Sequence, residues 1–327
     1  MKGRLPSAAA IVFLGVMIAL LDSCAYVNVS LPRAEGPLKE KVISGKGKDK
    51  ILLISLENII SDEKRSRLIG GREESVVGRV KEELDKAAKD GAVKAVVVRI
   101  NSPGGTATAS DIVYQELRSY KEKKGVKAIA CMMDLAASGG YMAAVACDKI
   151  VAHPTSITGS IGVIALKINA GGLLQKIGVE NETMKAGDKK DMVSPLRGLT
   201  PEEREILQKV LDELKEQFED RVATGRKNLT LQQVKALADG RIFTAKQALT
   251  AGLIDRIGYL EDAIELAKTE ANLTDAKVVA YHQPSGYKST VYSEVPDANP
   301  STINLLNIDL GALLKGGGVS FMYLWMP

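Results

Sequence analysis

Aromatic side chains are scarce in this chain. Only 4% of its 327 residues are Phe, Trp or Tyr, although 45% are hydrophobic. A core with so few aromatics consists mainly of Ala, Val, Ile and Leu, which is typical of layered α/β folds, where small helices pack closely on sheets. The chain also lacks a strong charge of either sign, because 44 basic and 40 acidic residues leave a net charge of +4. We see no basic stripe, and this argues against nucleic acid as a partner.

Cysteine is nearly absent as well, with three residues in the whole chain. Cys131 and Cys147 each lie in an apolar run, so we expect two buried free thiols. A disulfide between them stays open if the protein is exported. Their spacing is not that of metal ligands, and the sequence predicts no metal site.

A long uncharged run occurs at the N-terminus. Lys2 and Arg4 precede the uncharged residues 5–21, and Cys24 follows. This order predicts a bacterial export signal, because the run is shorter than the roughly 20 residues of a spanning helix. "LDSC" resembles a lipobox, in which Cys24 becomes the lipidated first residue. The alternative is an uncleaved signal anchor. Both place most of the protein outside the cytoplasm, tethered to a membrane.

The apolar pattern divides the rest of the chain. We expect a signal peptide or anchor over 1–23, a linker over 24–48, a catalytic domain over 49–270 and a C-terminal extension over 271–327. The linker is polar without a clear period, and the last fifty residues lose periodicity. The chain ends in the apolar "SFMYLWMP" behind three glycines. We expect this tail to dock on its own chain, on a neighbouring copy or on lipid.

Strands and helices alternate through the first half of the predicted domain. Apolar runs at 50–60, 93–100 and 126–134 predict buried strands, and helical patterns separate them. The turns "NSPGG" and "LAASGG" follow two successive strands, at residues 101–105 and 135–140. Active sites are built at the carboxyl ends of parallel strands, so both turns are candidate site loops.

The second half of the domain is predicted to be mainly helical. Residues 155–169 and 179–187 have strand-like patterns. A long helix follows them. Its start is marked by Thr200 as N-cap, Pro201 at the first helical position and Glu203, which completes a capping box. We assign the apolar stripe of this helix to core or subunit packing.

Ser138 in "AASGGY" is the candidate nucleophile. A serine hydroxyl attacks a carbonyl only when a base removes its proton. The chain has no G-x-S-x-G motif, and its two histidines are His153 and His282. His153 directly precedes Pro154 and is therefore expected to be extended, and no carboxylate is suggested to orient it. This pattern favours a packed or surface histidine.

Lysine is the alternative base, because burial disfavours its charged form. Serine–lysine pairs are a known variant of the catalytic triad. The candidates are Lys185, Lys189 and Lys190 in "ETMKAGDKKDMVSP". From the residues alone, these lysines are expected to lie on a solvated loop.

Five motifs in this order resemble the signal peptide peptidase A family: "RINSPGG", "AASGGY", "DKIVAHPTSITGSIGV", "MKAGDKKDMVSP" and "ADGRIFTAKQALTAGLID". The resemblance spans about residues 50–265. It implies a Clp-protease/crotonase-like α/β fold of stacked β-β-α units with helical C-terminal elements. It implies Ser138 as nucleophile, Lys190 as general base and Ser160 as a residue that helps to hold the lysine. It implies no cofactor and a homo-oligomeric ring.

Two glycines are the expected oxyanion donors. The backbone N–H groups of Gly105 and Gly139 can stabilise the negative oxygen of a tetrahedral intermediate, and glycine lets the substrate backbone approach closely.

The sequence thus predicts a membrane-associated serine endopeptidase that cuts hydrophobic peptides, such as signal peptides already released from their preproteins. Two alternatives remain. One is a crotonase-type acyl-CoA enzyme, which the export signal and the serine–lysine pair disfavour. The other is a catalytically inactive scaffold that binds peptides at a membrane.

Overall fold

The computed structural model describes residues 37–63, 65–66, 72–73, 75–282 and 320–326. The predicted signal segment and Cys24 lie outside these residues. In the part of the chain that the structure describes, no helix has both the length and the apolarity needed to cross a membrane.

Fourteen strands and eight helices occur in the described residues. The strands are β1 (Lys39–Ser44), β2 (Lys50–Glu57), β3 (Arg65–Ser66), β4 (Arg72–Glu73), β5 (Val93–Ser102), β6 (Gly104–Thr106), β7 (Lys127–Ala137), β8 (Lys149–Ala152), β9 (Ile157–Gly159), β10 (Ile164–Leu166), β11 (Ile242–Thr244), β12 (Arg256–Ile257), β13 (Lys277–His282) and β14 (Ser320–Leu324). The helices are α2 (Val76–Ala88), α3 (Ala107–Lys124), α4 (Gly139–Val145), α5 (Gly171–Lys176), α6 (Pro201–Gly225), α7 (Leu231–Leu237), α8 (Ala245–Thr250) and α9 (Leu260–Glu270).

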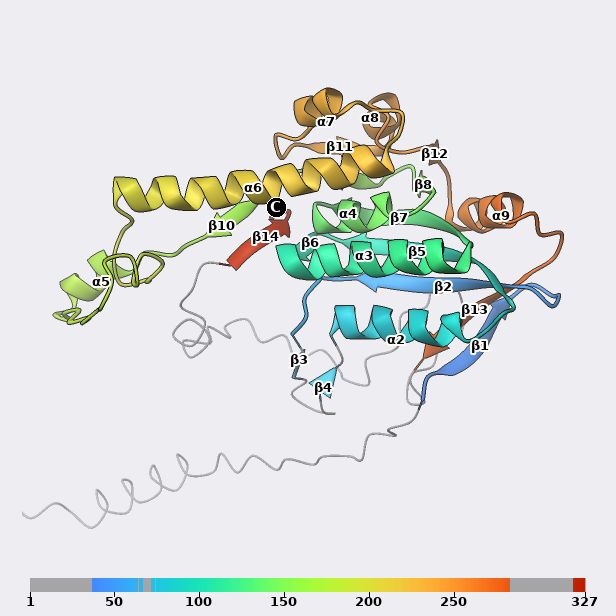
Figure 1. Ribbon diagram of the computed structural model, residues 1–327, viewed down its shortest axis with the longest axis horizontal. Coiled ribbons are helices and arrows are strands. Elements are labelled where there is room, and N and C mark those ends of the chain that lie inside the picture. The colour runs from blue at the N-terminus through green and yellow to red at the C-terminus, as the bar shows by residue number, and fades with distance from the viewer. Residues whose placement is uncertain (1–36, 64, 67–71, 74, 283–319, 327) are drawn as a thin grey trace, which may run out of the picture.

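The main sheet runs in the order β1-β13-β2-β5-β7-β8-β12. All its neighbouring strands are parallel except β1, which pairs antiparallel with β13 at one edge. The end of β7 also pairs with β9, and β9 pairs with β11. A small second sheet has the order β10-β14-β6. Figure 1 shows α2, α3 and α4 stacked along one side of the main sheet.

Both faces of the main sheet are covered, and the alternation of β2 shows this. Ile54 belongs to a large buried cluster with Val80 of α2 and Tyr114 of α3. Leu53, one position earlier, belongs to a second cluster with Ala263 of α9. Successive side chains of a strand point to opposite faces, so each face has its own helical layer. The predicted α/β class, the β-β-α unit (β5, β6 and α3) and the helical C-terminal elements are confirmed.

The structure differs from the predicted segment boundaries in two places. Residues 24–48 were expected to be linker, yet Lys39–Ser44 form β1. Residues beyond 270 were expected to be an extension, yet β13 lies inside the main sheet between β1 and β2. The two strands pair with each other, and the strand–strand hydrogen bonds explain why a short polar segment such as β1 is ordered. Residues 179–187, expected to be strand-like, form no strand.

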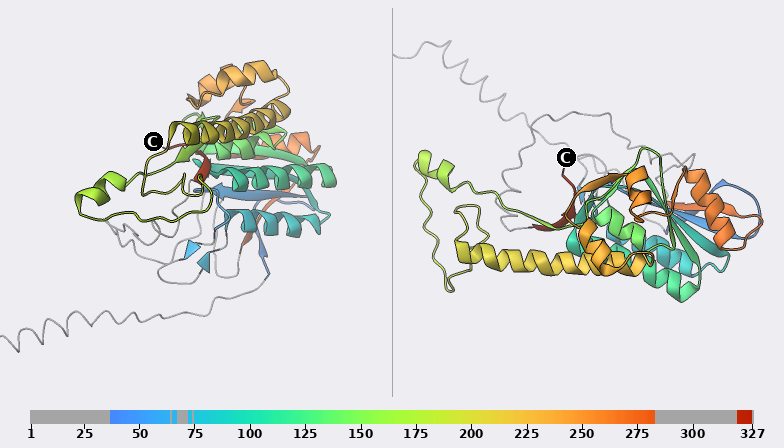
Figure 2. Two further views of the ribbon diagram at one scale, coloured as in Figure 1. Left: turned by 60° about the vertical axis from the view of Figure 1, so that its left-hand side comes forward. Right: turned by 90° about the horizontal axis from the view of Figure 1, so that it is seen from above.

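Helix α6 begins as the sequence predicts. Thr200 and Glu203 form a capping box, and Pro201 opens the helix. Only part of α6 packs on the body: Phe218 and Val222 are fully buried in the main cluster. The N-terminal part of α6 extends away from the sheet. Residues 164–200, which we call the arm, extend in the same direction (Figure 2).

The predicted free thiols are confirmed. Cys131 and Cys147 are both buried and unpaired with each other. Burial raises the pKa of each thiol to about 12, because an apolar environment disfavours the thiolate. The two cysteines therefore act as small apolar core residues.

Candidate functional site

Ser138 lies where β7 ends and α4 begins. Its backbone has φ 52° and ψ −118°, outside the regions that L-residues commonly adopt. Such a conformation costs about 1–3 kcal/mol and persists only when its surroundings enforce it. The Ser138 N–H donates to the Gly159 carbonyl at 2.8 Å, and the Ser138 carbonyl accepts from the Met142 N–H at 2.9 Å. The strand–turn–helix setting is that of a nucleophile elbow, although the glycine signature is absent.

The Ser138 hydroxyl has no partner in the described residues. The side chain is buried, with 1% of the residue exposed, and Oγ makes no hydrogen bond. A buried hydroxyl without a partner is unfavourable by about 1–3 kcal/mol. Unsatisfied buried groups of this kind are uncommon and are often explained by a catalytic role. The nucleophile expected from the sequence therefore lies in a suitable setting.

The two glycine turns meet at Ser138. A Cβ added to Gly104, whose φ is +101°, would lie 2.7 Å from the Gly139 nitrogen. A Cβ on Gly105 would lie 1.8 Å from the Ile60 carbonyl oxygen, and one on Gly139 would lie 2.2 Å from the Ser110 hydroxyl. No side chain fits at these three positions. Gly104 therefore lies directly against the turn at Ser138, whereas Gly105 is packed against Ile60 and Gly139 against Ser110.

Ser160 also lies beside the nucleophile turn. Ala137 pairs with Gly159 across β7 and β9, so Ser160 directly follows the residue that accepts from Ser138. Ser160 has a φ of 50°, is buried, and donates its N–H to the Arg241 carbonyl at 2.8 Å. The structure thus brings Ser138, Ser160 and the glycine turns together.

Lys190 is not brought to them within one chain. It lies on the arm with an exposed side chain, and its N–H donates to the Gly187 carbonyl at 3.1 Å. Because Ser138 Oγ has no hydrogen-bond partner in the described residues, the Lys190 ammonium is not in hydrogen-bond contact with it. Figure 1 shows the arm projecting away from the sheet, with α5 at its far end.

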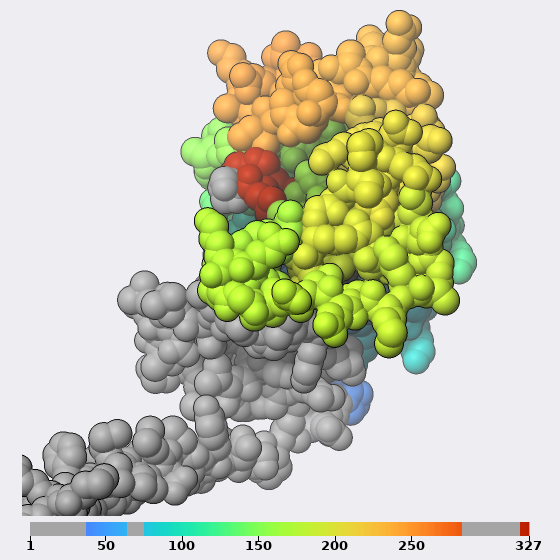
Figure 3. Space-filling view, turned by 90° about the vertical axis from the view of Figure 1, so that its left-hand side faces the viewer, coloured from blue at the N-terminus to red at the C-terminus, as the bar shows by residue number. Residues whose placement is uncertain are grey.

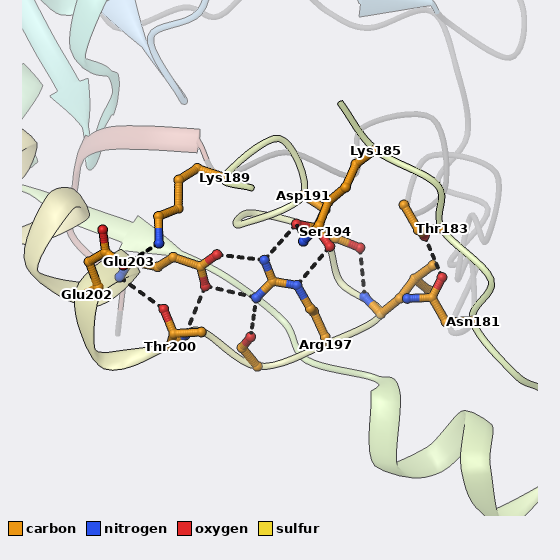
Figure 4. Close-up of polar contacts among 12 residues, drawn as sticks. Asn181, Thr183, Lys185, Lys189, Asp191, Ser194, Arg197, Thr200, Glu202 and Glu203 are labelled. Atoms are coloured by element: carbon orange, nitrogen blue, oxygen red, sulfur yellow. Dashed lines mark hydrogen bonds and ion pairs between the residues drawn. The ribbon is translucent and has the colours of Figure 1, made fainter. Parts of the chain in front are cut away.

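An ion-pair network holds the segment around Lys190 (Figure 4). Arg197 donates to both oxygens of Asp191 at 2.9 and 2.7 Å, and to both oxygens of Glu203 at 2.8 and 2.6 Å. Lys185 also donates to Asp191, at 2.7 Å. Hydrogen bonds from Arg197 hold the Asp191 pKa well below its usual range and lower the Glu203 pKa to about 2. We call these four residues the arm clamp.

His153 is occupied elsewhere. Its Nδ1 lies 2.8 Å from the Thr155 hydroxyl, and its ring contacts Tyr259 edge-on with 5.0 Å between the centroids. It makes no hydrogen bond to Ser138, whose Oγ is unpartnered in the described residues. This geometry agrees with the sequence pattern, which favours a packed or surface histidine.

The C-terminal tail reaches the site. Strand β14 pairs antiparallel with β6, so that Tyr323 lies opposite Gly105, and it pairs with β10 on its other side. The tail therefore docks on the chain itself, one of the three outcomes expected from its apolarity. The sequence analysis did not name Gly104 as a site residue. Its position next to Gly105 in "SPGG" was the signal that could have indicated it.

The chain is similar in sequence to known proteins. The model of peptidase family S49 matches residues 120–274. A protein of Enterococcus faecium that carries the name signal peptide peptidase SppA is 38% identical over 253 residues, which cover 77% of this chain and 73% of that protein. The chain belongs to peptidase family S49, the signal peptide peptidase A family. It is therefore a serine-type peptidase.

Relatives also occur in Synechocystis and in a plant. A Synechocystis protein named as a protease is 45% identical over 193 residues, covering 59% of this chain and 69% of that protein. The chloroplastic serine protease SPPA of Arabidopsis thaliana is 40% identical over 181 residues, which cover 55% of this chain and 26% of that protein. Among solved structures, a mutant form of ClpP1 from Listeria monocytogenes has a TM-score of 0.42 at 15% identity, covering 65% of this chain and 94% of that one.

Proposed function

We propose that this serine peptidase uses Ser138 as its nucleophile and Lys190 as its general base, with the Gly105 and Gly139 amides as oxyanion donors. The unpartnered, buried hydroxyl of Ser138 on its strained turn carries the proposal. Attack of Oγ on a peptide carbonyl gives a tetrahedral oxyanion next to the glycine turns, and the lysine returns the proton to the leaving amine. Ser160 helps to hold the lysine amine.

The proposed base does not reach the Ser138 hydroxyl of its own chain, because this Oγ has no hydrogen-bond partner in the described residues. A lysine serves as a base near neutral pH only after desolvation, yet Lys190 is exposed in a single chain. We therefore propose that an arm delivers Lys190 to the Ser138 site of a neighbouring copy, as part of a homo-oligomeric ring. Insertion of the lysine between two copies removes it from water and gives Ser138 Oγ its partner.

The apolar surface of the arm supports assembly. Six large hydrophobic side chains between residues 166 and 184 are exposed: Leu166, Ile168, Leu173, Ile177, Val179 and Met184. Met184 is 97% exposed. Exposed apolar side chains in this number on one segment favour a protein interface. Burial of this surface against a second copy is the expected source of its stability.

We propose that the substrates are hydrophobic peptides, such as signal peptides already cut from their preproteins. We also propose that the protein is membrane-associated, with its catalytic domain outside the cytoplasm. The support is the name of the Enterococcus faecium relative and the export-like N-terminus, with Cys24 as the proposed lipidation site. Lipidation is tested by mass spectrometry of the membrane fraction, in which a Cys24→Ala chain is expected to lose the lipid mass.

Peptide cleavage tests the dyad. Wild type, Ser138→Ala and Lys190→Ala are compared on one hydrophobic peptide, with Lys189→Ala and His153→Ala as matched controls. The first two variants are expected to lose cleavage by about 1000-fold or more, and the controls to keep it within a few-fold. An inactive Lys189→Ala beside an active Lys190→Ala would show that the base assignment is wrong. A wild type that neither cuts nor reacts with a serine-directed probe would favour the scaffold alternative.

Mixing the two inactive variants tests the delivery of the base between copies. A mixed ring contains sites that combine an intact Ser138 from one copy with an intact Lys190 from another. Cleavage is therefore expected to return when Ser138→Ala and Lys190→Ala chains are assembled together. If both residues act within one chain, every mixed ring stays inactive, and the proposed exchange of arms is wrong.

A further inference from the structure

Five neighbouring strands of the main sheet begin with lysines. β13, β2, β5, β7 and β8 are parallel, so their first residues lie at one end of the sheet. Each strand has a lysine as its first or second residue, namely Lys277, Lys50, Lys94, Lys127 and Lys149. We call the segments at this end the basal face, which consists of residues 46–50, 89–94, 123–127, 148–149 and 270–277. Figure 1 shows this end of the sheet at the right and the arm at the left.

The basal face is strongly basic. It contains ten lysines and five acidic residues, a net charge of +5, whereas the whole chain has a net charge of +4. Seven of the ten lysines are exposed, but only one of the five acidic residues, Asp275. The exposed lysines are Lys46, Lys48, Lys89, Lys94, Lys123, Lys124 and Lys127. The sequence shows no basic stripe because these lysines belong to separate turns that only the fold brings together.

The seven exposed lysines make no ion pair within the described residues. Asp90 and Asp148 are already paired, at 2.8 and 3.1 Å, with lysines that are not among the seven. Lys89, Lys123 and Lys124 lie at the ends of α2 and α3, where lysine offsets the helix dipole. The other four lie in or before strands, where no such effect accounts for them. The basal face therefore retains a positive charge that an anionic partner can neutralise.

A hollow of about 390 Å³ lies within the basal face. Lys94, Lys124 and Lys127 line it, together with Asp90 and Glu270. Because Asp90 already has its ion pair, Glu270 is the one remaining carboxylate of the lining. An ammonium group is a compact charge with three donors, and several of them around one hollow suit a phosphate group. The chemistry of the hollow thus fits the headgroup of an anionic phospholipid.

We propose that the basal face docks on the anionic surface of a membrane, with phospholipid headgroups in and around the hollow. The inference rests on the proposed membrane association of the protein. A lysine close to an anionic bilayer strengthens binding by about fivefold. Figure 3 shows the opposite end of the molecule, which carries the arm, α6 and β14. Assembly through the arm therefore leaves the basal face free for lipid.

The length of the chain before β1 permits this orientation. Leu38 directly precedes β1 and is fourteen positions after Cys24, a segment that spans at most about 50 Å. β1 begins opposite the last residue of β13, so it runs towards the basal face over about 20 Å. An anchor at Cys24 therefore reaches the level of the basal face. Ser138, which follows the other end of β7, then lies about 30 Å from the bilayer, and peptides reach it only after they leave the lipid.

Lysine labelling on vesicles tests the docking. The full chain is reconstituted into vesicles of phosphatidylcholine, or of equal parts of phosphatidylcholine and phosphatidylglycerol, and is treated with a water-soluble acetylating reagent. Mass spectrometry measures the labelling rate of each lysine. Lys94, Lys124 and Lys127 are expected to react at least about threefold more slowly on the anionic vesicles, and Lys209 on α6 equally fast on both. High salt is expected to remove the difference, because it screens exposed charges.

Charge reversal supplies the matched variants. Lys94→Glu combined with Lys127→Glu is expected to return Lys124 to its labelling rate on neutral vesicles. Lys209→Glu combined with Lys235→Glu makes the same change in net charge on exposed positions of α6 and α7, and is expected to leave Lys124 protected.

Equal labelling of the three basal lysines on both kinds of vesicle would overturn the docking and leave the membrane association intact. Protection of these lysines by inorganic phosphate without vesicles would indicate a site for free anions and would also overturn the docking. A chain that attaches to neither kind of vesicle would contradict the membrane association on which the docking rests. The cleavage tests of Ser138 and Lys190 are independent of all three results.

Discussion

The body and the arm of this protein are stabilised by different physical means. The body holds Ser138 by close backbone packing, with glycines at contacts where no Cβ fits. The arm holds the segment around Lys190 by ion pairs centred on Arg197, with apolar side chains exposed to water. The proposed nucleophile is thus positioned by one chain alone, whereas the proposed base lies on an arm for which we propose a partner copy.

Large-to-small changes are expected to separate body from arm most strongly. Ile54 is fully buried in the main cluster, and Ile54→Ala is expected to lower the free energy of unfolding by about 2–5 kcal/mol. Leu173 on the arm is 63% exposed, and Leu173→Ala is expected to change it by less than about 0.5 kcal/mol while weakening assembly. Chemical denaturation and sedimentation measure the two effects. A large loss of unfolding free energy in dilute Leu173→Ala would contradict the contrast.

Gly139→Ala is expected to reduce kcat about 100-fold or more. The added Cβ would lie 2.2 Å from the Ser110 hydroxyl and displace the amide proposed as an oxyanion donor. Steady-state cleavage measures the loss. The control is Gly91→Ala, where an added Cβ meets nothing within 4 Å. A Gly139→Ala enzyme as active as the control would show that this amide has no role in catalysis.

Arg197→Ala is expected to reduce cleavage about tenfold and to leave the melting temperature of the body nearly unchanged. Loss of the guanidinium frees Asp191, the residue after Lys190, from its hydrogen bonds. Arg256→Ala is the matched control, because Arg256 pairs with Asp262 on the body surface. Full activity of Arg197→Ala would mean that the arm clamp does not position the base.

Acid is expected to loosen the arm before the body. Both clamp carboxylates have lowered pKa values in the folded state, Glu203 about 2. Their contribution is therefore present above the unfolded pKa of about 4 and is lost as the pH falls towards 2. Hydrogen exchange of residues 185–203, compared with that of β5 and β7, measures the effect. Equal loss of protection in both regions would contradict a clamp that acts locally.

The sequence predicted the body better than the arm, for a physical reason. Strands such as β5 and caps such as Thr200 follow from local periodicity and side-chain chemistry, and both are confirmed. β1 and β14 were missed as strands because each is short and is ordered by a partner distant in sequence. Local patterns carry little information about such pairings.

The part of the candidate site on the body was likewise predicted better than the part on the arm. The turn at Ser138 was predicted from its glycines, but the strained φ values of Ser138 and Ser160 have no sequence signature. The exposure of Lys190 agrees with the solvated loop expected from the residues alone. The separation of Lys190 from Ser138 within one chain depends on the path of the arm, which periodicity does not determine.

Labelling by a serine-directed acylating probe tests whether Ser138 on the body is activated by Lys190 from the arm. The probe is incubated with wild-type and Lys190→Ala protein, and the modified residue is located by mass spectrometry. Ser138 is expected to be the residue modified in wild type, and Lys190→Ala is expected to slow its modification about 100-fold or more. Modification of another serine, or equal rates at Ser138 in the two proteins, would contradict a nucleophile on the body that is activated by a base from the arm.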